Sequence, residues 1–523
     1  MPEVRLAEAI SALSLSIDIG MGQPLEQGMR TCLIATRLAG LVGLDDIDAR
    51  RVFYLALLRH VGCTAESEMA ASFLGDEIVF RSGAMMLDFT KPSAMFPYVL
   101  RTVGAGKSPV GRALQIAKMM AGQKTFMGSF AAVCETGQML AGRLGFDEVV
   151  IAGLAQIFEH WDGKGLPGDV AGEDIVLPAR FVAIAELFEG LCRMDGHEAA
   201  VDVIRRRSGS AFAPDVTDAL CANAEALAAP LEQATVWDDV LAVEPPAGPG
   251  GAPGNLTDGE FDDVLMAMAD FTDLKSSYTL GHSRGVADLA AAAGRLAGLP
   301  AADVTMLQRA GWVHDVGRVG VSTAVWSKEA TLSRDDWEKV RLHPYYTERV
   351  LTRPAALARL GELASTHHER LDGAGYHRAV PGSVLTTASR ILAAADGYRA
   401  RIEPRPHRSP HTAADAAASL REEARDGRLA PEAVDAVLAA AGQGGGLRSR
   451  TQVGGLTERE VEVLRLVARS LSIKEIAKDL TVSPKTVDAH IQHIYTKLGV
   501  STRAGATLFA MEHGFVDRAS ATA

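Results

Sequence analysis

Short apolar stretches separated by polar positions run along most of this chain, and two of them lead into pairs of polar residues. The segment LQRAGWV is an apolar helix pattern that ends immediately before His314 and Asp315. A second apolar helix pattern precedes His367 and His368. Because a buried helix can deliver the residues at its end to the interior, the two pairs are predicted to face one cavity. No apolar run approaches the roughly 20 residues needed to span a bilayer, so no membrane partner is expected.

The clearest periodicity lies near the C-terminus, where three helix starts fall within thirty residues. Thr457 with Glu460, and Ser472 with Glu475, have the spacing of capping boxes, and Ser483 before Pro484 is a third start. The residues predicted to face inward are Val461, Leu464 and Val467 on the first helix and Val487, Ile491, Ile494 and Leu498 on the third. A trihelical unit with a short turn before its last helix favours a helix-turn-helix. A helical interaction or dimerisation module is the alternative that this pattern leaves open.

Two stretches rich in glycine and proline divide the chain into three blocks. The predicted organisation is a helical domain in residues 1–243, a linker in 244–256, a second helical domain in 257–440, a linker in 441–455 and a small C-terminal domain in 456–519. The chain is rich in alanine and has only 6% aromatic residues, which favours helix over strand. The predicted fold class is therefore all-α.

Charge and cysteine content narrow the possible functions. The net charge is -12, so any contact with nucleic acid must come from a locally basic face. Residues 473–503 supply one, with five Lys or Arg against three acidic residues. The five cysteines include no CxxC pair, so neither a disulfide framework nor a zinc ribbon is indicated. The N-terminus lacks the pattern of a secretion signal, and a cytoplasmic location is expected.

The first block contains a faded copy of the second. Residues 159–189 align with residues 369–399, so that Glu186 falls on Asp396. The dipeptide Asp162-Gly163 falls on Asp372-Gly373 in the same alignment. Upstream, Arg59 and His60 stand where the second copy has His314 and Asp315, and Ile157 and Phe158 replace His367 and His368. The distance between the two landmarks is about 45 residues longer in the first copy, counted from Gly62 to Asp162 and from Gly317 to Asp372. The first copy is predicted to keep the fold without the metal chemistry.

The second block carries a set of residues that can hold two metal ions. The set consists of His282, His314, Asp315, His343, His367, His368 and Asp396. Imidazoles and carboxylates without thiolates suit divalent iron, manganese or zinc, and one carboxylate can bridge two ions. A pair of metal ions favours hydrolysis of phosphate esters.

The motifs HDVGR at His314, HP at His343 and HHERLDGAGY from His367 to Tyr376, with the later Asp396, resemble the HD-GYP branch of the HD phosphohydrolases. The resemblance covers about residues 271–438 and implies hydrolysis of cyclic di-GMP at two metal ions. It places His282, His314, Asp315 and Asp396 on one ion, places His343, His367 and His368 on the other, and makes Asp315 the bridge. By the same resemblance Asp315 and Arg318 are the catalytic residues, and the loop that shapes the substrate pocket contains Asp372, Gly373, Gly375 and Tyr376.

Four positions depart from the family pattern. Arg318 replaces a lysine, His377 replaces the proline of the GYP motif, and Arg399 replaces a second aspartate. Tyr278 stands where some members have a glutamate for a third metal. Arginine keeps the charge of lysine but not its geometry as a point donor. These departures favour binding of a nucleotide with slow turnover, as in a sensor.

The motifs LTEREVEVLRLVA, KEIA, SPKTVDAHI and KLGV resemble the LuxR-type DNA-binding domain over nearly its full length. The resemblance places Asp488, Ala489 and Gln492 against base edges of double-stranded DNA. It assigns backbone contacts to Lys474, Ser483, Lys485, Thr486, His490 and Lys497. Family members often have lysine at Asp488 and asparagine at Ile473, so a preferred DNA sequence cannot be taken from relatives. The helix after Ser501 resembles a dimerisation helix, which implies a homodimer, although simple packing of Ala504, Leu508 and Met511 on the trihelical core is an equal alternative.

Together these features predict a DNA-binding transcriptional regulator whose metal-containing HD-GYP-like domain senses, and slowly hydrolyses, a nucleotide such as cyclic di-GMP. The alternative is an active cyclic-dinucleotide phosphodiesterase that a DNA-binding tail places on the chromosome. A third alternative is an interaction scaffold in which the metal only stabilises the fold.

Overall fold

The computed structural model describes residues 4–87, 91–246, 254–442 and 456–516. Across these residues every regular element is a helix, which confirms the predicted all-α class. The chain divides into two compact units after Val264, within helix α15 (Asp258–Asp273). Both linker predictions fall largely on residues 247–253 and 443–455, which lie outside the described part of the chain. Among the described residues, no helix has the length and apolar character needed to cross a membrane.

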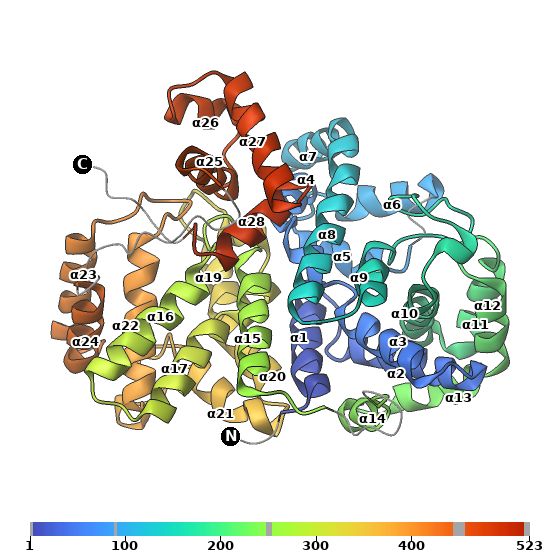
Figure 1. Ribbon diagram of the computed structural model, residues 1–523, viewed down its shortest axis with the longest axis horizontal. Coiled ribbons are helices and arrows are strands. Elements are labelled where there is room, and N and C mark those ends of the chain that lie inside the picture. The colour runs from blue at the N-terminus through green and yellow to red at the C-terminus, as the bar shows by residue number, and fades with distance from the viewer. Residues whose placement is uncertain (1–3, 88–90, 247–253, 443–455, 517–523) are drawn as a thin grey trace. The chain divides into compact units, whose positions relative to one another are not determined.

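The first unit is built around three helices that pack on one another, drawn in blue to green in Figure 1. They are α2 (Gln27–Val42), α3 (Asp46–Leu58) and α10 (Leu177–Asp195). The other helices of this unit are α1 (Leu6–Gly20), η1 (Val61–Thr64), α4 (Ser67–Leu74), α5 (Glu77–Ala84), α6 (Pro92–Thr102), α7 (Pro109–Ala121), α8 (Gln123–Arg143), α9 (Glu148–Ala155), η2 (Gly172–Asp174), α11 (His197–Arg206), α12 (Pro214–Ala222), α13 (Ala224–Ala228), η3 (Ala229–Glu232) and α14 (Trp237–Ala242). Large side chains such as Phe53, Phe181 and Phe188 are fully buried there and form the core.

The second unit has the corresponding three helices at its centre. They are α16 (His282–Leu296), α17 (Ala301–Val313) and α22 (Thr387–Ile402), and α16 packs on both of the others. The remaining helices before residue 443 are η4 (Val316–Gly320), α18 (Thr323–Trp326), α19 (Arg334–Arg341), α20 (His343–Leu351), α21 (Ala355–Ala364), η5 (Gly382–Val384), α23 (Ala413–Arg425) and α24 (Pro431–Gly442). Alanine and glycine on α16 let its neighbours approach closely, since a Cβ on Gly311 of α17 would lie 2.5 Å from the Cα of Ala287.

The two copies share details of backbone packing that the sequence alignment implied. A Cβ on Gly62 would lie 1.9 Å from the carbonyl oxygen of Val133, and one on Gly317 would lie 2.1 Å from that of His343. Both positions therefore require glycine. In each copy a buried glutamate also ties down the following loop: Glu369 accepts from the amides of Arg378 and Val380, and Glu159 accepts from those of Gly168 and Asp169.

The boundary predicted after residue 243 stays a prediction, but Glu244 itself is part of the packed first unit. Its carboxylate is buried and accepts a hydrogen bond from the Tyr54 hydroxyl over 2.6 Å. Arg5 donates a second hydrogen bond to it, also over 2.6 Å. The first residue that composition assigned to a linker is thus held by Arg5, near the start of the first unit, and by Tyr54 of α3.

The C-terminal helices begin where the polar pattern predicts. They are α25 (Glu458–Ala468), α26 (Ile473–Asp479), α27 (Pro484–Leu498) and α28 (Arg503–Glu512), drawn in red in Figure 1. Both capping boxes are formed, and the Ser483 hydroxyl accepts from the amide of Thr486. The predicted inward faces are buried, except that Val461 and Leu498 are only partly buried and Val463 joins Leu464 and Val467 in the core.

Candidate metal centre and DNA-binding surface

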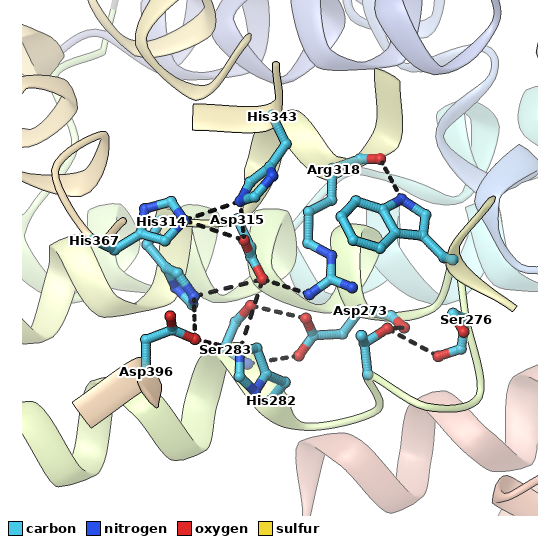
Figure 2. Close-up of polar contacts among 12 residues, drawn as sticks. Asp273, Ser276, His282, Ser283, His314, Asp315, Arg318, His343, His367 and Asp396 are labelled. Atoms are coloured by element: carbon cyan, nitrogen blue, oxygen red, sulfur yellow. Dashed lines mark hydrogen bonds and ion pairs between the residues drawn. The ribbon is translucent and has the colours of Figure 1, made fainter. Parts of the chain in front are cut away.

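The seven predicted metal ligands come from five helices of the second unit and converge on one buried position. His282 begins α16, His314 and Asp315 follow α17, and His343 begins α20. His367 and His368 follow α21, and Asp396 lies in the buried face of α22. Figure 2 shows His282, His314, His343, His367 and Asp396 arranged around the carboxylate of Asp315. Helix ends and one helix face thus bring together residues that are up to 114 positions apart, from His282 to Asp396.

The two oxygens of Asp315 face two different pairs of histidines. Oδ2 lies 3.6 Å from Nε2 of His282 and 3.5 Å from Nε2 of His314. Oδ1 lies 3.4 Å from Nε2 of His343 and 3.5 Å from Nε2 of His367. A carboxylate placed in this way can contribute one oxygen to each of two metal ions.

The donor atoms also form two groups by proximity. His282, His314 and Asp315 can each present one ligand atom within 4.8 Å of the others, and so can His343, His367 and His368. Asp396 lies beside both groups, because its Oδ1 is 3.2 Å from Nε2 of His282 and its Oδ2 is 3.8 Å from Nδ1 of His368. The grouping is the one that the family resemblance implies.

Three of the histidines are held by backbone carbonyl groups three residues earlier in the chain. Nδ1 of His314 bonds to the Gly311 carbonyl over 2.8 Å, and Nδ1 of His343 bonds to the Val340 carbonyl over 2.6 Å. Nδ1 of His367 bonds to the Ala364 carbonyl over 2.7 Å. A carbonyl can only accept, so Nδ1 carries a proton, and in a neutral ring Nε2 then keeps its lone pair. Such contacts orient histidines that bind metals.

An unbonded ring nitrogen and the charge states of the ligands are those expected of a metal site. Nε2 of His314 is buried and makes no hydrogen bond to any described residue. Burial lowers the pKa of His314 to about 4 and that of His343 to about 3, so both rings are neutral at physiological pH. Burial alone would raise the pKa of Asp315, but Arg318 and the surrounding imidazoles hold it well below its ordinary value. Neutral imidazoles and ionised carboxylates are the forms that bind divalent ions.

His282 is oriented by a carboxylate that the sequence analysis did not identify. Its Nδ1 donates to Oε2 of Glu403 over 2.7 Å, and the half-buried carboxylate of Glu403 pairs with both Arg399 and Arg405. Burial opposes protonation of His282, but Glu403 and Asp396 together raise its pKa to about 10. Glu403 closes α22, and 121 residues separate it from His282, so no local pattern marks the pair.

Two of the departures from the family pattern act outside the ligand set. Arg399 pairs with Oε1 of Glu403 over 3.1 Å and so supports the residue that orients His282. The backbone carbonyl of Tyr278 accepts a hydrogen bond from Arg405, which also pairs with Glu403. Neither substitution removes one of the seven predicted ligands.

Arg318 contacts the bridging carboxylate and an indole ring. Its Nη1 lies 2.9 Å from Oδ2 of Asp315, and its guanidinium carbon lies 4.0 Å from the ring centre of Trp326. The indole nitrogen of Trp326 donates to the Arg318 carbonyl over 3.3 Å (Figure 2). A planar guanidinium stacks on an aromatic face better than an ammonium does. Trp326, which the sequence analysis did not single out, therefore accounts for arginine at this position.

The predicted substrate loop runs beside the histidines. The ring of Tyr376 packs on that of His368 with centroids 4.6 Å apart. A Cβ on Gly375 would lie 2.5 Å from the Cα of Glu369, so this position requires glycine, whereas Asp372 and Gly373 form the exposed turn before it. His377 points its Nε2 to Glu348 over 2.8 Å, and Arg378 pairs with the same carboxylate.

The predicted base-contacting residues lie on the exposed side of α27. Asp488, Ala489 and Gln492 are exposed, while Val487 and Ile491 on the opposite face are buried. Among the predicted backbone contacts, Lys474, Lys485 and Thr486 are exposed and His490 is half-buried. Ser483 and Thr486 are also joined by a hydrogen bond of 2.7 Å at the start of α27.

Lys497 has an intramolecular partner that its predicted role did not include. Its Nζ lies 2.7 Å from Oε2 of Glu460, the acidic residue of the first capping box. Lys497 thus links α27 to the start of α25.

On α28, Ala504, Leu508 and Met511 are buried within the chain itself, which supports packing on the trihelical core. The homodimer stays a prediction.

Comparisons with known proteins agree with this geometry. The sequence model of the HD domain matches residues 129–216 and 266–433, so it finds part of both copies. The model of "Bacterial regulatory proteins, luxR family" matches residues 455–510. The "3'3'-cGAMP-specific phosphodiesterase 3" of Vibrio cholerae is 29% identical over 409 residues, which are 77% of this chain and 88% of that protein. A "Cyclic di-GMP phosphodiesterase" of Thermotoga maritima is 30% identical over 186 residues, 34% of this chain and 50% of that protein.

Among solved structures, the crystal structure of a cyclic GMP-AMP specific phosphodiesterase of V. cholerae superposes with a TM-score of 0.58 at 26% identity. The matched region covers 84% of this chain and 98% of the V. cholerae protein chain. Together with the sequence matches, this structural likeness shows that the chain contains an HD domain and, at its C-terminal end, a domain of the luxR family of bacterial regulatory proteins.

Proposed function

We propose that the second helical domain is a metal-dependent phosphodiesterase for a 3',3'-linked cyclic dinucleotide, joined to a domain that binds double-stranded DNA. The observation that carries this proposal is the carboxylate of Asp315, whose two oxygens face two separate histidine pairs at 3.4–3.6 Å. A carboxylate in this position can bind one metal ion with each oxygen. Sites with two metal ions are typical of enzymes that hydrolyse phosphoesters.

The proposal gives a role to each predicted metal ligand, to Arg318 and to Tyr376. His282, His314 and Asp396 would hold one ion, His343, His367 and His368 the other, and Asp315 would bridge them. When bound, such ions activate water at neutral pH and offset the charge of a phosphodiester. Arg318 lies beside the bridging carboxylate and would place a positive charge next to a phosphate. The ring of Tyr376 would give a base a flat surface.

The choice of a cyclic dinucleotide rests on the relatives. Proteins similar to this chain bear the names of phosphodiesterases for 3'3'-cGAMP and for cyclic di-GMP. The relative that covers 77% of this chain is named for 3'3'-cGAMP, whose guanine and adenine differ in the pattern of hydrogen-bonding groups on their edges. We therefore expect 3'3'-cGAMP and cyclic di-GMP to be the substrates to test first.

The direct test is turnover by the purified full-length protein loaded with Mn²⁺ or Fe²⁺. The products of 3'3'-cGAMP and of cyclic di-GMP would be followed by chromatography, with Asp315→Asn as the matched variant. We expect a linear dinucleotide from the wild-type protein and none from the variant. Failure of the metal-loaded wild-type protein to cleave either compound would contradict the phosphodiesterase.

A second candidate is a regulator that binds the nucleotide and releases it without rapid cleavage. It is favoured by the contact between Arg318 and Asp315, because a guanidinium already paired with the bridging carboxylate is less available to a phosphate. In this case nucleotide binding would bias DNA binding through a difference in affinity between two states. A gel shift with and without nucleotide, using metal-loaded protein beside the turnover assay, separates the two candidates.

A further inference from the structure

The first helical unit contains a cavity of about 550 Å³ where its metal ligands have been replaced. Phenylalanine, methionine and leucine side chains line much of it, among them Phe80, Phe126, Phe130, Phe158 and Phe212. A large part of the apolar lining comes from α5 to α8, which lie in the stretch where this copy is longer than the second. Cavities of this size with apolar walls and a few polar groups are typical of small-molecule sites.

One end of the cavity is polar and is built from the residues that stand at the former ligand positions. Nε2 of His60 lies 2.8 Å from Oε1 of Glu186, and Arg59 pairs with Oε2 of the same carboxylate. These residues occupy the positions of Asp315, Asp396 and His314 in the second copy. All three are buried, and all three line the cavity.

Cys63 continues this arrangement on the other side of the imidazole. Its Sγ lies 3.7 Å from Nδ1 of His60 and lines the same cavity. With the Nε2 proton of His60 on the Glu186 side, the Nδ1 lone pair faces the thiol. Thiol, imidazole and carboxylate then stand in the order of nucleophile, base and orienting group.

The charges around Cys63 favour its thiolate. Burial opposes ionisation, but His60, Arg81 and Arg59 lower the pKa of Cys63 below the ordinary thiol value. Burial also works against protonation of His60, yet Glu186 and Cys63 raise its pKa, so the pair is suited to exist as thiolate and imidazolium. The other titratable groups that line the cavity are Glu66, Glu159, His160 and Arg207.

For the other four cysteines the pKa of the thiol is raised, not lowered. Burial raises the pKa of Cys134 and of Cys192 to about 12, and it also raises the pKa of Cys32 and Cys221. Cys134 is the closest match to Cys63, since both are 7% exposed. Its Sγ donates to the Ala155 carbonyl over 3.5 Å.

We propose that Cys63 is a nucleophilic thiol that bonds covalently to an apolar α,β-unsaturated carbonyl compound held in this cavity. His60 takes the thiol proton, and the sulfur attacks the β-carbon of the alkene as the C=C π pair moves toward the carbonyl. The resulting enolate takes the proton back from His60, so the net change is addition of S–H across the double bond. Neither an oxidant nor a further reactant is needed. Arg59 also lines the cavity and pairs with Glu186, so a positive charge lies at the polar end.

The experiment uses the full-length protein and N-phenylmaleimide, an apolar reagent of this class, at limiting concentration. Peptide mass spectrometry after timed quenching gives a rate for each cysteine between pH 5 and pH 9. We expect Cys63 to react at least about tenfold faster than Cys134 at pH 7, because each pKa unit changes the thiolate fraction about tenfold. We also expect the midpoint of its pH–rate curve to lie below about 8.5, the value of a free thiol. Labelling of Cys63 that is no faster than that of Cys134 would overturn the proposal.

Two variants test the relay. His60→Gln should slow labelling of Cys63 at pH 7 by about tenfold and move the midpoint of its pH–rate curve upward, since the base is lost. Cys63→Ser should remove the fast adduct from the intact mass while labelling at Cys134 is unchanged. An unchanged midpoint in His60→Gln would contradict the relay. The comparison between Cys63 and Cys134 in the wild-type protein decides the proposal even where a variant fails to fold.

Discussion

The carboxylate of Glu403 accepts a hydrogen bond of 2.7 Å from Nδ1 of His282. The bond fixes the ring so that Nε2 faces Asp315 and Asp396. Glu403 is in turn held by Arg399 and Arg405. His282 is thus the predicted ligand held by an anionic side chain, whereas His314, His343 and His367 rely on neutral backbone carbonyls.

Glu403→Gln should therefore weaken metal binding without removing any predicted ligand. The amide can still accept from Nδ1, but it lacks the negative charge that makes the imidazole a better donor to a metal. We expect the affinity for Mn²⁺ to fall by about 10- to 100-fold, measured by calorimetry or by competition with a metal indicator. Glu362→Gln, at an exposed position of α21, is the matched control and should leave the affinity unchanged. Equal affinities in the two variants would show that Glu403 has no part in orienting a ligand.

Asp315→Asn tests the proposed bridge between the two ions. The substitution keeps the size of the side chain but replaces one carboxylate oxygen by an NH₂ group that cannot bind a cation. We expect bound metal to fall from two ions toward one or none, and cleavage of cyclic dinucleotide to fall by more than about 100-fold, since even residues that only orient metal ligands are worth 10- to 100-fold. Metal content by elemental analysis and turnover by chromatography check the two parts. Retention of two tightly bound ions would contradict the bridge.

The predicted ligand set rests on local sequence signals, and the structure brings its members together. His314 with Asp315, and His367 with His368, are adjacent and follow apolar helix patterns, and the spacing of the whole set resembles a known family. Glu403 and Trp326 were not predictable in this way, because their partners His282 and Arg318 become neighbours through folding and stacking alone. The thiol relay in the first unit was missed for a related reason. Cys63 and His60 are close in sequence, but Glu186 comes from α10, and the cavity walls combine helices α5 to α8 with residues distant in the sequence.

The helix starts in the C-terminal domain were predictable for the same local reason. Each capping box needs only residues three positions apart, and the structure contains both. The ion pair between Lys497 and Glu460 joins residues 37 positions apart and was not anticipated. A residue predicted to contact DNA thus has a structural role as well, which sequence spacing gave no means of recognising.

Arg318→Lys tests why arginine stands at the position of the family's lysine. The ammonium keeps the charge beside Asp315 but loses the planar stacking on Trp326. We expect activity within about tenfold of wild type, because cation–π stacking of a partly buried pair is worth about 1 kcal/mol. Arg318→Met should lower kcat much more than Arg318→Lys does, because it removes the charge. A methionine variant as active as the lysine variant would exclude electrostatic help from this position.

Glu460→Gln should destabilise the C-terminal domain, and the loss should depend on pH. Burial would raise the pKa of Glu460, but Lys497 and Thr457 lower it to about 2. A carboxyl group with a lowered folded-state pKa adds stability above its ordinary value near pH 4.3, and this contribution disappears as the pH falls toward 2. We expect the free energy of unfolding at pH 7 to fall by about 1–2 kcal/mol in the variant.

Hydrogen exchange of peptides from residues 456–516, measured in the full-length protein, checks this prediction. The gap between wild type and variant should be constant from pH 6 to pH 8 and should narrow below pH 4. Glu462→Gln, on the same helix but half-exposed and paired with Arg459, is the control and should change little. A gap that persists unchanged at low pH would mean that the carboxylate charge is not the cause.

Lys485 and Gln492 lie on the exposed side of the same helix, and we expect them to contribute differently to DNA binding. Lys485→Ala should weaken binding to all sequences and make it less dependent on salt, because one phosphate contact releases about one counterion. Gln492→Ala should instead cost about 1–3 kcal/mol on the preferred site and little on others, since an amide can read adenine through two hydrogen bonds. Binding titrations on a selected site and on a scrambled site, each at several salt concentrations, measure both effects. If Gln492→Ala weakened binding equally on the two sites, α27 would contact the DNA backbone there and another residue would read the base.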